Sequence, residues 1–248
     1  REAQQLGYAE ANPTADVEGY DAMYKLSILS SMAFHAHMPI DVIYREGITR
    51  LTAEDFEAAE LLGYEIKLLA IGKKSGNAIE VRVHPTMVPK AHPLASVRGV
   101  FNAIFLTGHA VGDVMLYGRG AGCMPTASAV MSDVIYACHA TGRHRYMTFR
   151  NDAALSNEVE LVRDFACVYC IRLSVADAPG TMAAIAAVFA GHGVSLKDVL
   201  QLGERVGGSS HITFMTHTAH ELSVQAALDE IRRLPCVHEV ESVIRAED

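Results

Sequence analysis

Positive charge is scarce in this sequence and is never clustered. The 248 residues include 21 Lys and Arg against 29 Asp and Glu, which gives a net charge of −8, and no three basic residues are consecutive. A groove for nucleic acid or a surface for anionic lipid requires clustered Lys and Arg. The sequence therefore predicts neither nucleic acid nor membrane lipid as a partner.

Long apolar runs are lacking as well. The stretch 178–196 contains no Asp, Glu, Lys or Arg, but Pro179, Gly180, His192 and Gly193 interrupt it, whereas a transmembrane helix needs ~18 consecutive apolar residues. The first residues, REAQQLGYAEANP, have no apolar core of the kind that a signal peptide contains. The five cysteines follow no disulfide-framework spacing, which fits a reducing compartment. We expect a cytoplasmic protein without a membrane segment.

The composition is otherwise that of a folded globular protein. Hydrophobic residues make up 50% of the chain and charged residues 20%, so the chain can bury enough apolar surface to fold. At ~150 residues per domain, the length predicts one or two domains. Residues 144–164 are polar and lack sustained periodicity, which indicates a linker. We therefore predict a first domain over 1–143, a linker over 144–164 and a second domain over 165–248.

The first domain alternates helical and strand-like patterns. Apolar residues at helical spacing predict a helix over 20–34. A capping box of Thr52 and Asp55, with a terminal glycine at Gly63, predicts a second helix. Short turns between the strand-like runs predict an α+β region with a mixed, largely antiparallel sheet and helices on one face. The expected strands are 66–73, 79–83, 100–106 and 111–117, followed by a helix over 125–140.

The second domain has the pattern of a β-α-β-β-α-β unit. Two helices can cover one face of a four-stranded sheet, which is the ferredoxin-like arrangement. The expected strands are 166–175, 194–202, 211–218 and 237–244, and the expected helices are 180–190 and 221–233.

One lysine early in the chain is the main candidate for chemistry. Asp21 and Lys25 are four residues apart in the expected helix and share a face with Ile28 and Met32. A lysine beside a carboxylate at the edge of an apolar stripe can be oriented as an acid or base. The alternative is an ordinary exposed ion pair, worth only ~0.2–0.5 kcal/mol. The preceding loop adds the acids Glu10 and Asp16, and such a group of acids suits a substrate with an ammonium group.

An ordered series of motifs in the first domain resembles the homoserine dehydrogenase family. The catalytic segment of that family has a Leu-Gly-Tyr-x-Glu stretch, an acidic loop and then Gly-x-Asp-x-x-x-Lys at the start of a helix, which Leu6–Glu10 and Gly19–Lys25 match. The resemblance covers about residues 1–142. It continues through Ile66-Lys-Leu-Leu69, Val83-His-Pro-Thr86, His92-Pro-Leu-Ala95, Val100-Phe-Asn-Ala103, Tyr117-Gly-Arg-Gly-Ala-Gly122 and Pro125-Thr-Ala-Ser128.

The resemblance implies an NAD(P)-dependent oxidoreductase of threonine, methionine and isoleucine biosynthesis that interconverts L-homoserine and L-aspartate 4-semialdehyde. It makes Lys25 the proton donor to the aldehyde oxygen. Glu10 and Asp21, together with Asp16, would hold the substrate, and Asp21 would also assist the lysine. The backbone at Gly7, Gly120 and Gly122 would approach the cofactor.

The dinucleotide fingerprint Gly-x-Gly-x-x-Gly is missing. The run Gly118-Arg-Gly-Ala-Gly122 is followed by Cys123 and does not open a βαβ unit. The full-length family carries a Rossmann domain in its N-terminal half, which would bind most of the NAD(P) and contain the sodium-site residues. We therefore expect this chain to be a C-terminal portion that alone neither binds NAD(P) well nor turns over.

The second domain resembles an ACT domain. The residues that carry this resemblance are the loop Asp177-Ala-Pro-Gly180 and the stretch 193–201. Such domains bind amino acids, usually between paired copies, so the resemblance implies threonine feedback with Asp177, Gly180 and Gln201 as ligand contacts. Domain pairing without a ligand is the alternative, and either reading implies a homodimer or homotetramer.

Several other residues do not predict a site. Cys167 and Cys170 have metal or redox spacing but point to opposite faces of a strand, so we expect core cysteines, and the scattered histidines predict no metal site. His84 and Asn102 fit either a site or satisfied polar groups. A second function for the whole chain stays open, namely a standalone amino-acid sensor whose first domain only dimerises.

Overall fold

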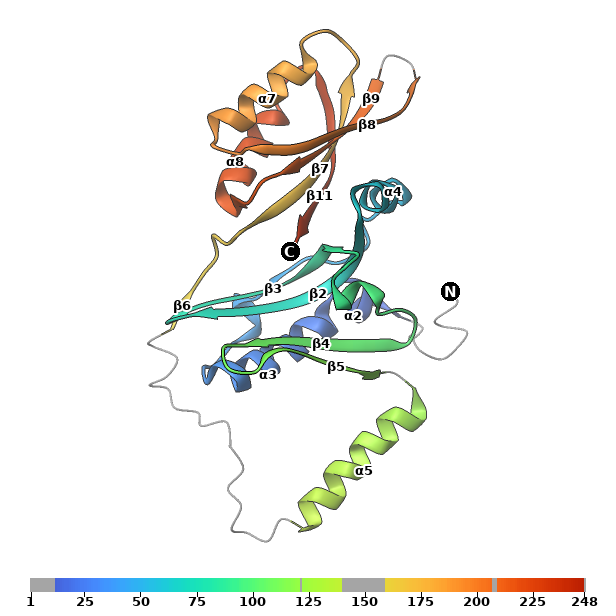
Figure 1. Ribbon diagram of the computed structural model, residues 1–248, viewed down its shortest axis with the longest axis vertical. Helices are drawn as coiled ribbons and strands as arrows, with labels where there is room; N and C mark the ends of the chain where they lie inside the picture. The colour runs from blue at the N-terminus through green and yellow to red at the C-terminus, as the bar shows by residue number, and fades with distance from the viewer. Residues whose placement is uncertain (1–11, 121, 140–158, 207–208, 248) are drawn as a thin grey trace.

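The computed structural model describes residues 12–120, 122–139, 159–206 and 209–247. The ACT-like part lies at one end of an elongated molecule, the first domain lies below it, and one long helix projects from the other end (Figure 1). The fold is α+β with a mixed sheet, as the sequence predicts.

A long hairpin organises the first domain. The strands β2 (Tyr64–Ser75) and β3 (Ala78–Pro89) pair antiparallel along their whole length. Helix α3 (Tyr20–Phe34) packs on them and buries Met23 and Leu26 in the cluster that contains Ile79, Val81 and Val83. The short helix α2 (Thr14–Val17) precedes α3. The expected helix over 20–34 is confirmed.

Helix α4 (Ala53–Leu62) begins and ends at the residues that the sequence predicts. The Asp55 carboxylate accepts a hydrogen bond from the backbone N–H of Thr52 at 2.9 Å, and Gly63 follows the helix with a φ of +84°. The first domain also contains three shorter segments. They are η1 (Ile40–Val42), β1 (Tyr44–Arg45) and η2 (Pro93–Ser96).

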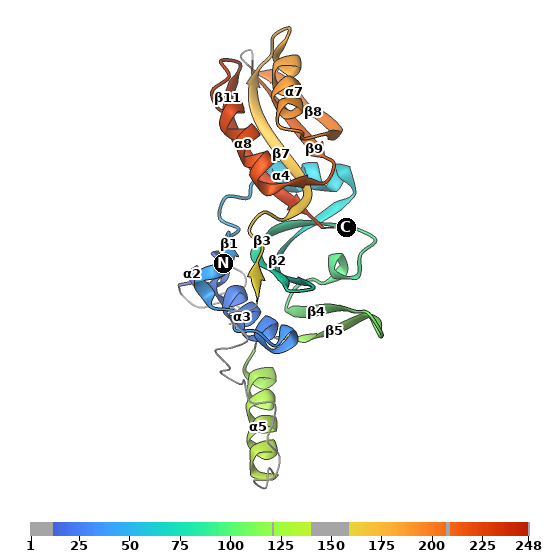
Figure 2. The same cartoon turned by 90° about the vertical axis from the view of Figure 1, so that its left-hand side faces the viewer.

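The last part of the first domain is open to solvent. Strands β4 (Phe101–Gly108) and β5 (Gly112–Arg119) form a separate two-stranded sheet, and helix α5 (Cys123–His139) follows. Figure 2 shows α5 projecting away from the rest of the described chain. No residue of α5 is buried against the described chain, although Val130 and Val134 are among its apolar residues.

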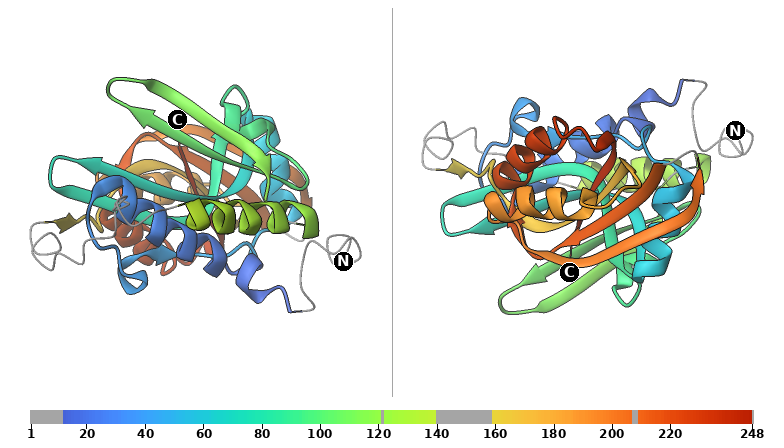
Figure 3. Two further views of the ribbon diagram at one scale, coloured as in Figure 1. Left: turned by 90° about the horizontal axis from the view of Figure 1, so that it is seen from below. Right: turned by 90° about the horizontal axis from the view of Figure 1, so that it is seen from above.

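The second domain has the expected β-α-β-β-α-β order. Its sheet runs β11-β7-β9-β8, and both helices lie on one face of it (Figure 3). Phe189 and Phe214 pack between helices and sheet in its core. The elements are β7 (Ala166–Ala176), α7 (Thr181–Gly191), β8 (Leu196–Val206), β9 (Ser209–Thr216), β10 (Ala219–His220), α8 (Glu221–Ile231) and β11 (Val237–Ala246).

The two domains share one sheet, which the sequence does not predict. One edge of β3 pairs with β2, and its other edge pairs in turn with β6 (Glu160–Leu161), β1 and β11, all of them parallel to β3. Strand β11 thus leaves the second domain and joins the first, giving a sheet of nine strands. Residues 160–161 of the expected linker are therefore a strand, and most of that linker lies outside the described residues.

Helix α4 covers the face of the second sheet that α7 and α8 leave open. Ala59 of α4 packs in a cluster with Cys170 and Met215 of that sheet, whereas Cys167 packs in the core under α7 and α8. Both cysteines are buried and free, so the prediction of core cysteines on opposite faces is confirmed.

In the part of the chain that the structure describes, none of the helices combines the length and the hydrophobicity that crossing a bilayer requires.

Candidate functional site

The first turns of α3 hold Asp21 and Lys25 together. The helix begins after Gly19, whose φ of +76° places it in the left-handed region. The Lys25 ammonium donates a hydrogen bond to Asp21 Oδ2 at 2.6 Å. The side chains are 62% and 49% exposed, respectively. The geometry therefore fixes the amine on its carboxylate but leaves both accessible to a substrate.

An open apolar face continues from this pair along α3. Tyr24, Ile28 and Met32 lie on it, and each is about half exposed. None of the described segments buries them. Without a cover, water would screen the charge of the lysine, so acid–base chemistry at this position requires that another chain segment or a substrate exclude solvent from the face.

Of the two candidate acids that precede α3, the structure describes Asp16 but not Glu10. Asp16 is exposed on α2, and no hydrogen bond to Lys25 is found among the described residues. Glu10 and Gly7 lie outside the described residues. The structure thus brings Asp21 and Lys25 together, while the roles of Glu10, Asp16 and Gly7 stay predictions.

The glycines expected near the cofactor lie at the turn from β5 into α5. A Cβ on Gly120 would stand 1.9 Å from the Asn102 amide nitrogen, so a larger residue at position 120 would require the Asn102 side chain to move. Gly122 has a φ of +117°. The backbone at Gly120 is exposed, and the first turn of α5 holds no acidic side chain. Such a helix N-terminus is compatible with a phosphate group, and so with a dinucleotide.

The residues expected to bind an amino acid lie near one end of the second sheet. Asp177 and Gly180 lie in the β7–α7 connection, and Gly180, with a φ of +95°, precedes α7. Gln201 on β8 donates a hydrogen bond to Ser210 Oγ at 2.7 Å. Ser210 in turn is the register partner of Val175, two residues before Asp177. These residues therefore share one region of the second domain, and their role stays a prediction.

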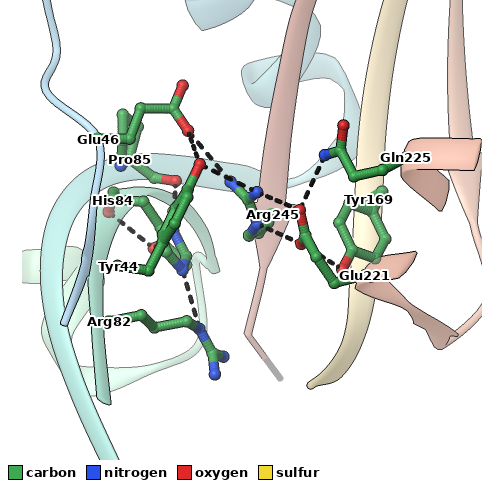
Figure 4. Close-up of polar contacts among 10 residues, drawn as sticks. Tyr44, Glu46, Arg82, His84, Pro85, Tyr169, Glu221, Gln225 and Arg245 are labelled. Atoms are coloured by element: carbon green, nitrogen blue, oxygen red, sulfur yellow. Dashed lines mark hydrogen bonds and ion pairs between the residues drawn. The ribbon is translucent and has the colours of Figure 1, made fainter. Parts of the chain in front are cut away.

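We did not predict a buried polar network between the two domains from the sequence. Figure 4 shows Arg245 at its centre. This guanidinium is 2% exposed and binds both oxygens of Glu221, at 2.9 and 2.6 Å, within the second domain. It also donates to Glu46 at 3.2 Å and to the Tyr44 hydroxyl at 3.3 Å in the first domain. Tyr169 completes the network by donating to Glu221 at 2.8 Å.

The charges of this network stabilise one another. Burial alone would raise the pKa of Glu221, but the hydrogen bonds and the charge of Arg245 outweigh it and lower that pKa. Burial likewise opposes the charge of Arg245, yet its hydrogen bonds to Glu221 raise its pKa overall. The network therefore keeps both groups ionised.

A second ion-pair network joins the domains beside α4. Arg172 of β7 donates to Asp55 at 3.0 Å and to Glu241 at 2.8 Å. Ser242 donates to the same Asp55 oxygen at 2.6 Å. The carboxylate that begins α4 therefore also anchors the second domain.

His84 is a satisfied polar group in β3. It is completely buried, accepts a hydrogen bond from Arg82 Nε at 2.9 Å, and has Nδ1 at 2.9 Å from the Pro85 carbonyl. Because Nε2 accepts, Nδ1 carries the proton and donates to Pro85. Burial first, and next the positive charge of Arg245, lower the pKa of His84 to about 3.

This shift predicts acid sensitivity. Between about pH 6 and about pH 4, His84 is protonated in the unfolded chain but not in the folded one. As the pH is lowered through this range, the free energy of unfolding should therefore fall by about 1.4 kcal/mol for each pH unit from this residue alone. In His84→Gln the contribution disappears. Urea denaturation of both proteins across this range should therefore show the stability difference between them shrinking as the pH falls. Parallel pH profiles would contradict the assignment.

The comparisons with known proteins agree with both sequence resemblances. A family model described as homoserine dehydrogenase matches residues 1–135, and a model of the ACT domain matches residues 171–236. Among curated relatives, the homoserine dehydrogenase of Neisseria gonorrhoeae is 39% identical over 252 residues, covering 100% of this chain and 58% of the relative. That of Synechocystis sp. is 43% identical over 256 residues, covering 98% of this chain and 58% of the relative.

Solved structures agree as well. The crystal structure of a homoserine dehydrogenase from Thiobacillus denitrificans has a TM-score of 0.88 at 39% identity and covers 100% of this chain and 57% of that one. A homoserine dehydrogenase from S. aureus has a TM-score of 0.70 at 29% identity, with coverages of 100% and 58%. The chain thus spans less than two thirds of the length of these relatives.

Proposed function

The chain belongs to the homoserine dehydrogenase family and contains an ACT domain, and from this premise we propose that it supplies the substrate site of an enzyme that interconverts L-homoserine and L-aspartate 4-semialdehyde. The observation that supports this most directly is the Lys25–Asp21 pair, with 2.6 Å between its charged atoms, at the edge of an open apolar face. An amino-acid sensor would need no lysine at such a position.

The chemistry assigned to these residues is proton transfer. Bound NAD(P) supplies the hydride for reduction or accepts it for oxidation. As the aldehyde carbon is reduced, its oxygen gains negative charge, and the Lys25 ammonium stabilises that charge and then donates a proton to the oxygen. In the reverse direction the neutral amine removes the hydroxyl proton. Asp21 holds the amine in position and, together with Glu10 and Asp16, binds the substrate ammonium group.

The cofactor would be bound mainly by a nucleotide-binding domain that this chain does not contain. We propose that this domain lies over the exposed face of α3 and reaches the backbone at Gly120 and Gly122. It would then exclude water from Lys25 and bring the cofactor to the substrate. Alone, the chain would neither bind NAD(P) well nor turn over.

A chimera tests this proposal. We expect the chain, fused to the nucleotide-binding portion of the Neisseria gonorrhoeae relative, to reduce NAD(P)⁺ in a homoserine-dependent manner, whereas the isolated chain should not. The chimera must first be shown to be folded and to bind NAD(P). A folded, cofactor-binding chimera without homoserine-dependent activity would favour the amino-acid sensor instead.

We further propose that the ACT domain binds threonine near Asp177, Gly180 and Gln201. A ligand that binds only the native state stabilises it by about 2.7 kcal/mol at a hundred times its Kd. Threonine should therefore raise the Tm of the chain, and Gln201→Ala should reduce the shift. Lys197→Ala, an exposed position on the same strand, is the matched control. An unchanged Tm at saturating threonine would indicate that the domain serves pairing only.

The exposed apolar side chains of the β4–β5 sheet support assembly into a homodimer or homotetramer. Ile104, Leu106 and Leu116 are each about half exposed. A second copy that covered them would remove this apolar surface from water.

A further inference from the structure

A cleft of about 420 Å³ lies between the two domains, beside β11. Its position follows from the sheet. Strand β1 pairs with β3 at Arg82–Val83, and β11 pairs with β3 at Thr86–Met87, so that the two strands diverge on either side of Pro85. The cleft opens between them and has Pro85 in its lining.

The edge of β11 that faces this cleft is not used by any described strand before Arg245. Residues 240–244 pair with β7 on one side, and contact with β3 begins only at Arg245. These residues line the cleft. An unpaired strand edge presents backbone donors and acceptors to a ligand.

The side chains that line the cleft carry one more positive charge than negative. Four arginines and three glutamates line it, and each glutamate already has a cationic partner. Glu18 lies near Arg45, at 3.7 Å, Glu46 pairs with Arg245, and Glu241 pairs with Arg172 outside the cleft. Arg45 and Arg245 therefore have carboxylate partners, and the networks of Arg245 and Arg172 include the further carboxylates of Glu221 and Asp55.

Two arginines remain, one from each domain. No carboxylate among the described residues pairs with Arg50 of the first domain. Arg232, at the end of α8, pairs within the described chain only with Asp229 of the same helix, at 2.8 Å, and such an exposed pair contributes little. Both guanidinium groups can therefore turn to a ligand and bind it in bidentate fashion.

We propose that this cleft binds a small doubly charged anion, held by Arg50 and Arg232 across the two domains. Its volume lies within the range of about 300–1,000 Å³ that small-molecule sites occupy. The chemistry fits a phosphate group or a dicarboxylate. The site is separate from the Lys25 face and from the region of Asp177 and Gln201, and its ligand binding does not depend on the proposed function.

The wall of the cleft is packed onto the beginning of α3. The Ile48 N–H donates to the Val17 carbonyl at 2.8 Å, and the Thr49 hydroxyl donates to Glu18 at 2.9 Å. A Cβ on Gly47 would stand 2.6 Å from the Val17 carbonyl oxygen, so that only glycine permits this approach. An anion in the cleft therefore fixes the ACT domain to the segment that leads into the helix of Asp21 and Lys25.

Calorimetric titration of the 248-residue chain with sodium phosphate, and separately with sodium succinate, tests the proposal, with sodium chloride at equal ionic strength as the reference. We expect saturable binding of at least one of the two anions, and which one binds tells phosphate recognition from dicarboxylate recognition. Arg50→Gln and Arg232→Gln should each weaken it at least tenfold. Arg233→Gln, an exposed neighbour outside the cleft, should change it less than twofold.

A second measurement asks whether the ligand bridges the domains. Hydrogen exchange at the backbone of residues 240–244 and around Ile48 should slow when the anion is bound, and it should not slow in either arginine variant. Binding that saturates for neither anion would overturn the proposal. So would binding that survives both Arg50→Gln and Arg232→Gln, or that Arg233→Gln weakens equally.

Discussion

Replacing Lys25 by alanine in the chimera should lower kcat for homoserine oxidation by about 10²–10⁴-fold, the range that a positioned acid or base contributes. The substrate should still bind, because its ammonium group is held by carboxylates and not by the lysine, so KM should change much less than kcat. Lys25→Arg should be nearly as impaired. Arginine keeps the positive charge, but its pKa is too high for it to accept the hydroxyl proton.

Lys90 offers a matched control for this experiment. It is also a partly exposed lysine paired with a carboxylate, that of Glu60, but it lies away from α3. Lys90→Ala should leave kcat unchanged within about twofold. If Lys25→Ala retained the wild-type rate in a folded chimera, the lysine would be an ordinary surface ion pair of the kind worth ~0.2–0.5 kcal/mol.

Removing Glu221 should destabilise the chain by about 3–5 kcal/mol, because it leaves the buried charge of Arg245 without its bidentate partner. Only Glu46 and the Tyr44 hydroxyl would remain, at 3.2 and 3.3 Å. The effect of Glu221→Ala is measured as the change in the free energy of unfolding in urea. Glu221→Gln should cost less, since its amide oxygen can still accept one hydrogen bond.

Glu230 is the control on the same helix. It pairs with His192 at 2.8 Å but is 56% exposed, so Glu230→Ala should cost less than about 1 kcal/mol. Adding Arg245→Met to Glu221→Ala removes the orphaned charge and should recover part of the loss. If Glu221→Ala cost no more than Glu230→Ala, the network would contribute little to stability.

Local features of the fold could be predicted from the sequence because their causes are local. The Thr52–Asp55 capping box and the glycine at position 63 lie within one helix, and both are found where the sequence places them. The β-α-β-β-α-β order follows from the same kind of pattern. Apolar periodicity alone is enough to find such elements.

The joining of the two sheets could not be predicted in this way. Periodicity identifies strands but not which strand edges meet, and β3 and β11 are separated by more than 140 residues of sequence. One signal was available. Arg172 and Arg245 each interrupt an apolar strand, and a charge at a buried position requires a partner. The sequence could thus have indicated that partners exist, but not that they are Asp55 and Glu46.

The site was predictable to the same extent. The spacing of Asp21 and Lys25 fixes their contact within one helix. The segment that would exclude solvent from Lys25 does not belong to that helix, so the spacing does not predict it. The cleft beside Pro85 could not be predicted from the sequence, because it depends on where β1 and β11 pair with β3.

Strand β11 also limits how the ACT domain can be exchanged. Deleting the ACT domain would remove the strand that pairs with Thr86–Met87, and it would remove the second domain's side chains from the apolar cluster that contains Ala59 of α4. A truncated protein would then expose the unpaired edge of β3, and exposed strand edges promote aggregation. Grafting a foreign ACT domain onto the first domain would therefore require that its last strand be grafted in register with Thr86–Met87 as well.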